Sequence, residues 1–244
     1  MVDAKPTIVL VHGAFADGSS WDGVIERLQR EGYRVEAPAI ALRVVGVDSA
    51  YLASVVKQID GPVLLVGHSY GGALISNAAT KVDNVIGLVF VAAFAPDTDE
   101  VLGDVAAESK DSILMTAQVK RTNPKGKDGE TAPEFLIDPA KLREVFAADI
   151  PEERTAVMAA TQRPVAAAAF TDRSGPPAWK TLPSWAVVAT ADKAAGTDLV
   201  QSMARRAGAE ITEIESSHVV MISQPQAVTE VIVKAAEALA ASDR

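Results

Sequence analysis

The segment 63–76, VLLVGHSYGGALIS, constrains the fold more than any other part of the chain. It opens with an unbroken apolar run, which is typical of a strand buried on both faces of a parallel sheet. Gly67, Ser69 and Gly71 then spell G-x-S-x-G, a turn from strand to helix that holds the serine backbone under strain. A Cβ atom at position 67 or 71 would collide across so tight a turn. The pattern predicts that Ser69 is a nucleophile standing clear of the sheet, rather than an incidental serine in a glycine-rich turn.

Length and composition predict one domain and exclude several kinds of partner. With 244 residues, 48% of them hydrophobic, the chain can bury one large core. Its net charge of −9, with no cluster of Lys or Arg, makes nucleic acids and anionic membranes poor partners, because both require a basic surface. No apolar run approaches the roughly 18 residues of a membrane span. We find no signal peptide, so the expected location is the cytoplasm.

The residue types needed for cofactor chemistry are also missing. The chain has no cysteine, which rules out disulfides, a thiolate nucleophile and cysteine-ligated metal. It shows no glycine-rich phosphate loop, no His/Asp cluster with metal-ligand spacing, and no flavin or nicotinamide fingerprint. We therefore expect neither a cofactor nor a metal.

Apolar runs alternate with segments of helical periodicity on both sides of the elbow segment. Ser19 or Ser20 can cap the first helix, which Gly32 ends, and Asp48 can cap the second. This alternation predicts parallel strands joined by right-handed crossovers. Further helices are expected at 197–207 and 226–239. The six predicted strands are 7–11, 33–37, 63–66, 85–92, 184–190 and 209–214.

The alternation is interrupted between residues 97 and 182. This segment carries most of the prolines, a polar loop at 122–130 and short helical pieces near 140–147 and 152–160, with no strand pattern. An insertion at the carboxyl edge of a parallel sheet lies over the site there, so we interpret 97–182 as a helical cap. The alternative is a second small domain or a mobile insertion. The core is then formed by 1–96 and 183–244.

A serine nucleophile requires a base, and the chain offers only three histidines. His68 neighbours Ser69 on the turn, where adjacent side chains diverge, so it does not easily reach the serine oxygen. His12 ends the first strand and is better placed to fix the following loop by hydrogen bonding. His218 follows the last predicted strand, at the same edge as Ser69. We therefore predict that His218 is the base.

The acid that orients this histidine should lie at a strand end, between the serine and the histidine in the chain. Asp192 directly follows the strand SWAVVAT and fits this position. Asp198 is better placed to begin a helix, and Asp172 lies in the cap. Glu213 and Glu215, on or beside the last strand, remain as substitutes.

The oxyanion of an acyl-transfer intermediate needs two backbone N–H donors. One is predicted at Tyr70, directly after the nucleophile. The other is predicted at Ala14, where Gly13 allows close approach, with Phe15 as the alternative. Candidate pocket residues are apolar side chains from these loops and from the cap, although core packing explains each of them equally well. They are Phe15, Phe94, Met115, Phe146 and Met158, with Tyr70 beside them.

Four motifs, HGAFADGSSW, GHSYGG, SWAVVATAD and SSHVVMISQP, occur in this order. Together they resemble the α/β-hydrolase superfamily, in particular the branch of plant methylesterases, hydroxynitrile lyases and bacterial pyrethroid-hydrolase-like esterases. The resemblance implies an α/β-hydrolase fold with a mainly parallel six-stranded sheet flanked by helices. It also implies Ser69, Asp192 and His218 as a triad and Ala14 with Tyr70 as oxyanion donors. The leading antiparallel strands of larger relatives are expected to be missing.

Two positions favour ester hydrolysis over the lyase reaction. In the hydroxynitrile lyases that this chain resembles, the first loop contains the pair His-Thr, and a lysine follows the catalytic histidine. Here these positions are Gly13 and Val219. The predicted function is hydrolysis of small carboxylic esters; a hydroxynitrile or C–C lyase and a ligand receptor without turnover are the alternatives. The natural substrate stays open, as does lactone, amide or perhydrolase activity. The oligomeric state is also open, with a homodimer among the options.

Overall fold

The computed structural model describes residues 5–124 and 130–242. Its centre is a sheet of six strands in the order β2-β1-β3-β4-β8-β9, and every neighbouring pair is parallel. The predicted α/β-hydrolase architecture, with a six-stranded parallel sheet, is confirmed. The strands are β1 (Thr7–Val11), β2 (Val35–Glu36), β3 (Val63–His68), β4 (Val85–Val91), β8 (Ser184–Ala189) and β9 (Glu210–Ile214).

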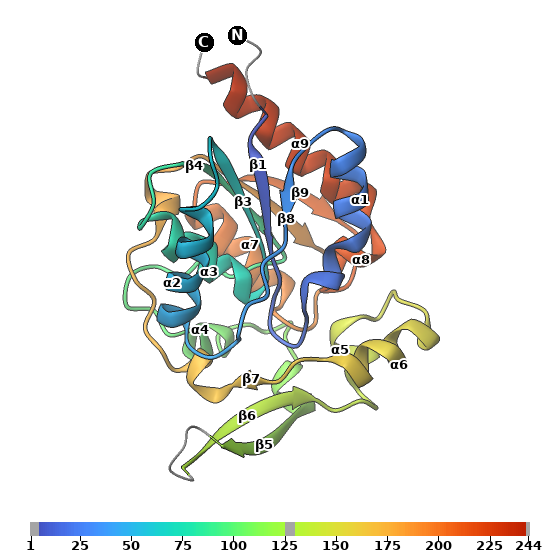
Figure 1. Ribbon diagram of the computed structural model, residues 1–244. Coiled ribbons are helices and arrows are strands. Elements are labelled where there is room, and N and C mark those ends of the chain that lie inside the picture. Colours follow the sequence, from blue (N-terminus) through green and yellow to red (C-terminus); the bar gives the residue numbers. More distant parts are fainter. Residues whose placement is uncertain (1–4, 125–129, 243–244) are drawn as a thin grey trace.

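Helices cover both faces of this sheet (Figure 1). On one side α2 packs against α3, and on the other α1 packs against α9. The strands β1 and β3 are completely buried, as their uniformly apolar sequences predict for strands covered on both faces. The helices of the core are α1 (Asp22–Arg30), α2 (Val45–Val56), α3 (Tyr70–Ala79), α7 (Thr197–Arg206), α8 (Val220–Ser223) and α9 (Pro225–Ser242), with short 3-10 turns at η1 (Gly18–Trp21) and η4 (Ala178–Lys180). Among the described residues, no helix is long and apolar enough to cross a membrane.

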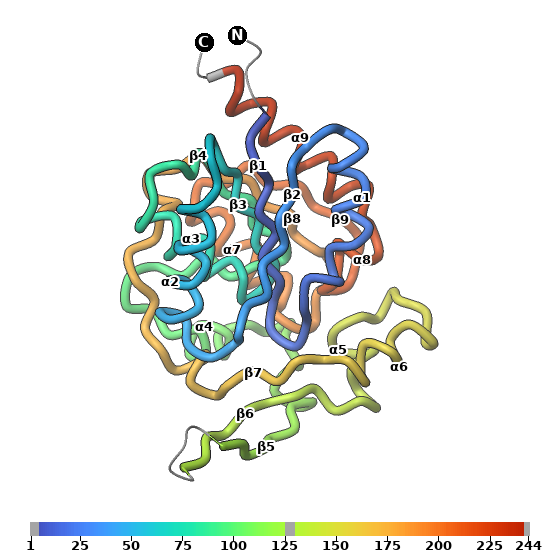
Figure 2. Tube along the Cα trace, viewed as in Figure 1, coloured from blue at the N-terminus to red at the C-terminus, as the bar shows by residue number. Residues whose placement is uncertain are grey.

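The register of the strands brings their carboxyl ends to one edge. Gly67 of β3 pairs with Val11 of β1, and His68 pairs with Val91 of β4. The residues that follow these strands therefore meet at a single edge of the sheet, as expected for parallel strands. Most of the segment 97–182 lies at this end of the molecule, opposite the start of β1 and the end of the C-terminal helix, and its last residues run back along the side of the core (Figure 2).

The cap is not purely helical, which corrects the prediction for 97–182. It contains an antiparallel three-stranded sheet in the order β5-β6-β7. Most residues of β5 are exposed and polar, so the strand has no alternation of apolar and polar residues that could have indicated it. Part of the predicted polar loop, Thr122–Pro124, belongs to β5, and residues 125–129 lie outside the described residues. The cap elements are α4 (Leu102–Ala106), η2 (Leu114–Ala117), β5 (Gln118–Pro124), β6 (Thr131–Ile137), α5 (Leu142–Phe146), α6 (Glu152–Thr161), β7 (Val165–Ala166) and η3 (Ala167–Phe170).

Two predicted helix caps are wrong. The first helical segment is capped by Asp17, whose side chain accepts a hydrogen bond from the Ser19 N–H, and neither Ser19 nor Ser20 is the cap. The second helix begins at Val45, so Asp48 lies inside its first turn. The Asp48 carboxylate is buried and accepts hydrogen bonds from the Arg43 N–H and the Tyr70 hydroxyl, which lie outside this helix. The sequence pattern of a helix cap does not reveal such contacts, so the predicted role of Asp48 was wrong.

Candidate active site

The turn at Ser69 has the strained geometry that the glycine pattern predicts. Ser69 has φ 53° and ψ −120°, a conformation that costs a non-glycine residue free energy. A Cβ atom on Gly67 would lie 2.5 Å from the Gly71 carbonyl oxygen, and one on Gly71 would lie 2.6 Å from the Val11 carbonyl oxygen. Both contacts are to backbone, which has little freedom to move away. The need for glycine at both positions is confirmed, but only the Gly67 clash lies across the turn, as predicted. At Gly71 the clash is with the end of β1.

His218 and Asp192 are paired in the interior. The His218 Nδ1 lies 2.7 Å from Asp192 Oδ2, and each side chain is only 1% exposed. The other carboxylate oxygen, Oδ1, accepts the N–H groups of Ala194 at 2.8 Å and Ala195 at 3.0 Å. These bonds fix the plane of the carboxylate. Because the Asp192 carboxylate can only accept a hydrogen bond, the proton lies on His218 Nδ1. His218 Nε2 is then free to act as a base.

Ser69 and His218 both line one cavity, called here the inner cavity, of about 150 Å³. Ala14 and Tyr70 line it as well, so the predicted nucleophile, base and oxyanion-donor residues surround a single space. Most of its other wall is apolar, with Phe94, Phe135 and Phe170 among the lining residues. In the described part of the chain, no hydrogen bond joins the Ser69 hydroxyl to the His218 ring. Such contacts often form fully only when substrate is bound.

The alternative acids are engaged elsewhere. Asp172 accepts the Gly46 N–H, Asp198 accepts the Ser109 hydroxyl, and Glu213 accepts the Gln201 side-chain amide. Glu215 follows β9 in the loop that leads to His218. Of the predicted acids, Asp192 is the one that is hydrogen-bonded to the His218 ring among the described residues.

His12 holds the loop that carries the second predicted oxyanion donor. Its Nε2 accepts the Ile40 N–H at 3.0 Å, so its Nδ1 carries the proton and donates to the Gly13 carbonyl at 2.9 Å. Because a trans peptide directs its C=O and N–H to opposite sides, fixing the Gly13 carbonyl also fixes the direction of the Ala14 N–H. The loop-fixing role predicted for His12 agrees with these bonds.

His68 contacts the backbone and the ring of His218, and forms no hydrogen bond with the Ser69 hydroxyl among the described residues. Its Nε2–H donates to the His218 carbonyl at 3.0 Å, and the two rings lie 4.6 Å apart between centroids. Burial lowers the pKa of His68 well below 6.5, and the neighbouring His218 lowers it further. Burial likewise lowers the pKa of His12. Both rings are therefore neutral in the folded protein.

The two buried histidines predict a loss of stability in mild acid. In the unfolded chain each ring takes up a proton near pH 6.5, whereas the folded protein resists protonation. The unfolded state then binds more protons, so the free energy of unfolding falls as pH falls below this value, by up to about 1.4 kcal/mol per pH unit and histidine. Urea unfolding at about pH 7.5 and about pH 5.5 measures this slope. A His12→Gln variant should show a shallower slope, and a wild-type stability that is constant over this interval would contradict the prediction.

Asp48 and Tyr70 form a contact that sequence reasoning missed. The Tyr70 hydroxyl donates to Asp48 Oδ2 at 2.9 Å, and the same oxygen accepts the Arg43 N–H. Burial raises the pKa of both the Asp48 carboxyl and the Tyr70 hydroxyl. The pair holds the Tyr70 side chain in the wall of the inner cavity. An aspartate 22 residues away in sequence gives no pattern that could reveal this contact.

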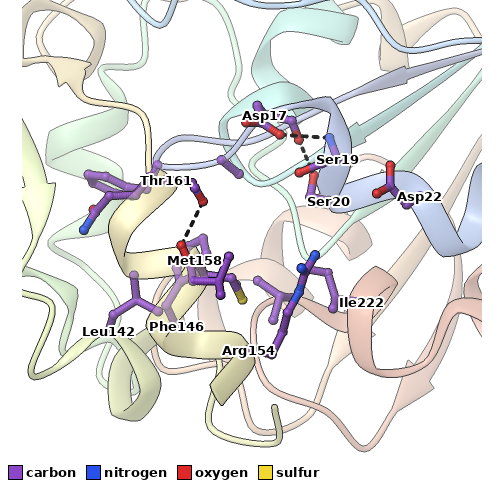
Figure 3. Close-up of a pocket in the computed structure, with 15 residues that line it drawn as sticks. Asp17, Ser19, Ser20, Asp22, Leu142, Phe146, Arg154, Met158, Thr161 and Ile222 are labelled. Carbon is purple, nitrogen blue, oxygen red and sulfur yellow. Dashed lines mark hydrogen bonds between the residues drawn. The ribbon is translucent and has the colours of Figure 1, made fainter. Parts of the chain in front are cut away.

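A second, outer pocket of about 260 Å³ lies between the cap and the loop after β1. Arg154 and Met158 of α6 face the segment Asp17–Asp22 across it (Figure 3). Phe15 and Phe146 belong to the linings of both the inner cavity and the outer pocket. Their rings meet edge to face, with centroids 6.3 Å apart. These two rings therefore form a shared wall.

The predicted pocket residues are divided between the two spaces. Phe94 and Met115 line the inner cavity, whereas Met158 lines only the outer pocket. Met115 is 73% exposed, which places it at the rim. Gln118, Phe135 and Phe170 line the inner cavity without having been predicted, because their places depend on the path of the cap.

Comparison with known sequences adds to this geometry. A model of the alpha/beta hydrolase family matches residues 8–231. A pyrethroid hydrolase from Sphingobium wenxiniae is 29% identical over 164 residues, which cover 60% of this chain and 56% of that protein. Methylesterase 2 from Arabidopsis thaliana is 31% identical over 167 residues, which cover 62% of this chain and 59% of the relative. The matched regions thus span less than two thirds of either relative.

Solved structures show the same fold across nearly the whole chain. The crystal structure of polyneuridine aldehyde esterase superimposes with a TM-score of 0.79, covering 95% of this chain and 99% of the other, at 20% identity. At this identity the similarity concerns the fold alone.

Proposed function

Since this chain belongs to the alpha/beta hydrolase family, we propose that it hydrolyses small carboxylic esters through an acyl-serine intermediate. One observation carries the proposal: the strained Ser69 lines the same cavity as His218, whose ring is bonded to a buried Asp192. A serine on a sharp turn, an imidazole and a fixed carboxylate are the parts that activate a hydroxyl for attack on a carbonyl. Relatives named hydrolase and esterase support the reaction class.

In the proposed mechanism, the Ser69 hydroxyl attacks the ester carbonyl while His218 Nε2 takes its proton. Asp192 keeps the proton on Nδ1 and stabilises the imidazolium that forms. The alcohol leaves with the proton from His218. A water molecule then gives its proton to His218 and attacks the acyl-serine. As the bond to the serine oxygen breaks, His218 returns this proton to that oxygen, which releases the acid and restores Ser69 and His218.

The negative charge on the carbonyl oxygen is assigned to the backbone N–H groups of Ala14 and Tyr70. Tyr70 is the first residue of α3, so its N–H has no partner within the helix. The Ala14 N–H is oriented by the bond from His12 to the preceding carbonyl. Each such donor contributes on the order of 3 kcal/mol to transition-state stabilisation in serine hydrolases.

The composition of the inner cavity favours hydrolysis over cyanohydrin cleavage. A leaving cyanide needs a nearby cation, and the described residues lining the inner cavity include neither Lys nor Arg. Val219, the residue after His218, is apolar and buried. An uncharged wall suits the acyl chain of an ester.

The two spaces indicate the shape of the ester. We assign the acyl chain to the inner cavity, because Ser69 and both donor residues line it and its wall is mainly apolar. The alcohol part is assigned to the outer pocket, which Val219 lines beside His218. The outer pocket also contains Asp17, Asp22 and Arg154, so it can accept a more polar group.

A panel of substrates tests the proposed function. p-Nitrophenyl acetate and butyrate should be turned over many times, and a fluorophosphonate should add covalently to Ser69, as detected by mass spectrometry of the tryptic peptide. Mandelonitrile and a lactone in the same panel separate the lyase and lactonase reactions. A single acylation without further turnover would identify a receptor, and release of cyanide faster than any ester cleavage would identify a lyase; either result contradicts the proposal.

A further inference from the structure

The cap contacts the proposed base at two points close together in sequence. Phe146, the last residue of α5, packs against the His218 ring, with centroids 5.1 Å apart. Asp149, three residues further on, reaches the loop that leads into His218. The connection from α5 to α6 is therefore the part of the cap that lies against the base.

Asp149 binds the two serines that precede His218. One carboxylate oxygen, Oδ2, accepts the Ser216 hydroxyl at 3.0 Å and the Ser217 N–H at 3.1 Å. The other oxygen accepts the Ser217 hydroxyl in a short hydrogen bond. Ser216 and Ser217 are 3% and 4% exposed, so these donors have little access to water. Burial raises the pKa of the Asp149 carboxyl, but the hydrogen bonds from Ser217, Ser223 and Ser216 outweigh it and hold the pKa below its usual value.

The core holds the same loop from the opposite side. The Ala191 N–H donates to the Ser216 carbonyl at 3.0 Å, and the His68 ring donates to the His218 carbonyl at 3.0 Å. On the other side, Asp149 holds Ser217 through its N–H and its hydroxyl, and it shares Ser216 with the Ser223 hydroxyl, which lies 2.8 Å from the Ser216 hydroxyl. The His218 imidazole therefore lies between the His68 ring of the core and the Phe146 ring of the cap.

We propose that Asp149 is a positioning residue for His218, so that the cap forms part of the catalytic apparatus as well as a cover over the cavity. This inference rests on the proposed function. An asparagine at this position keeps one acceptor oxygen but places an NH2 group where the other carboxylate oxygen was. The Ser217 N–H or the Ser217 hydroxyl then loses its acceptor, and the loop must rearrange to satisfy it. A displacement of about 1 Å in a catalytic group can cost about 100-fold in rate. Substrate binding should change little, because Asp149 lines neither the inner cavity nor the outer pocket.

The test compares Asp149→Asn with Glu100→Gln in the full-length protein. Glu100 also joins the cap segment to the core, through Arg206 of α7, but it does not contact the His218 loop. Asp149→Asn should lower kcat by roughly tenfold or more with KM within about threefold of wild type, whereas Glu100→Gln should leave kcat within about twofold. Ser217→Ala should lower kcat in the same direction, and the double variant should lose no more than the worse single variant. A kcat within twofold of wild type for Asp149→Asn, or an equal loss in Glu100→Gln, would overturn the proposal.

A measurement without substrate separates this inference from the proposed function. The proton between His218 Nδ1 and Asp192 should give a low-field NMR signal that is absent from His218→Gln. In Asp149→Asn this signal should shift or broaden, and in Glu100→Gln it should remain as in wild type. An unchanged signal in Asp149→Asn would contradict positioning, whatever the activity of the protein. The side chain of Asp149 reaches the surface, and circular dichroism with Tm verifies that the variant is folded; if it is not, Ser217→Ala carries both measurements.

Discussion

Replacing Ser69 with alanine should lower kcat/KM for p-nitrophenyl butyrate by about 10⁴ to 10⁶-fold, the range found when a serine hydrolase loses its nucleophile. The variant keeps the cavity and the oxyanion donors, so it can only orient the ester for attack by water. The φ of 53° at position 69 is equally unfavourable for serine and for alanine. The substitution should therefore leave the strain of the turn unchanged and remove only the hydroxyl. Initial rates at high enzyme concentration measure the residual activity.

Ser76→Ala provides a matched control for this experiment. Ser76 lies on the same helix, α3, and its buried hydroxyl has no hydrogen-bond partner among the described residues. Removing an unpartnered buried hydroxyl is neutral or slightly stabilising, so this variant should retain wild-type activity. Turnover by Ser69→Ala equal to that of Ser76→Ala would exclude an acyl-serine mechanism.

Replacing Asp192 with asparagine should lower kcat by about 10³ to 10⁴-fold while leaving the fold intact. The N–H groups of Ala194 and Ala195 both require an acceptor, so the amide oxygen must face them. The amide nitrogen then faces His218 Nδ1 and donates to it. This interaction places the ring proton on Nε2, where the base must accept the serine proton, and the protonated nitrogen cannot do so.

The control for this charge change is Asp198→Asn. Asp198 accepts hydrogen bonds from Ser109 and Lys110 and lies six residues further along the chain, without contact to the His218 ring. Its kcat should stay within about twofold of wild type. If Asp198→Asn lost more activity than Asp192→Asn, the orienting acid would have to be reassigned.

The parts of the fold that the sequence predicted are those set by local physics. An unbroken apolar run signals a buried parallel strand, and glycines at 67 and 71 signal a turn whose sterics exclude a side chain. Parallel strands bring their carboxyl ends to one edge, and this topology alone places His218 and Asp192 near each other. The parallel direction of the strands and the identity of that edge therefore followed from patterns within single segments, whereas the order of the strands in the sheet was not predicted.

The missed features depend on contacts between distant segments. The strand β5 is mostly polar and mostly exposed, so its own residues show no strand pattern, and its pairing with β6 stabilises it. Asp48 resembles a helix cap in sequence, yet its carboxylate bonds to Tyr70 on another helix. Asp149 is the one charged residue in the short connection 147–151, and its significance depends on how closely the cap approaches residues 216–218.

The wall shared by Phe15 and Phe146 has a consequence for how such a chain can diversify. Both residues line both spaces, so a smaller side chain at either position should enlarge the two together. If the two parts of the ester occupy these spaces as proposed, selection for a bulkier acid portion would also alter the fit of the alcohol portion. Independent tuning of the two ends of the ester must come from side chains that belong to one compartment only, such as Phe170 on one side and Met158 on the other.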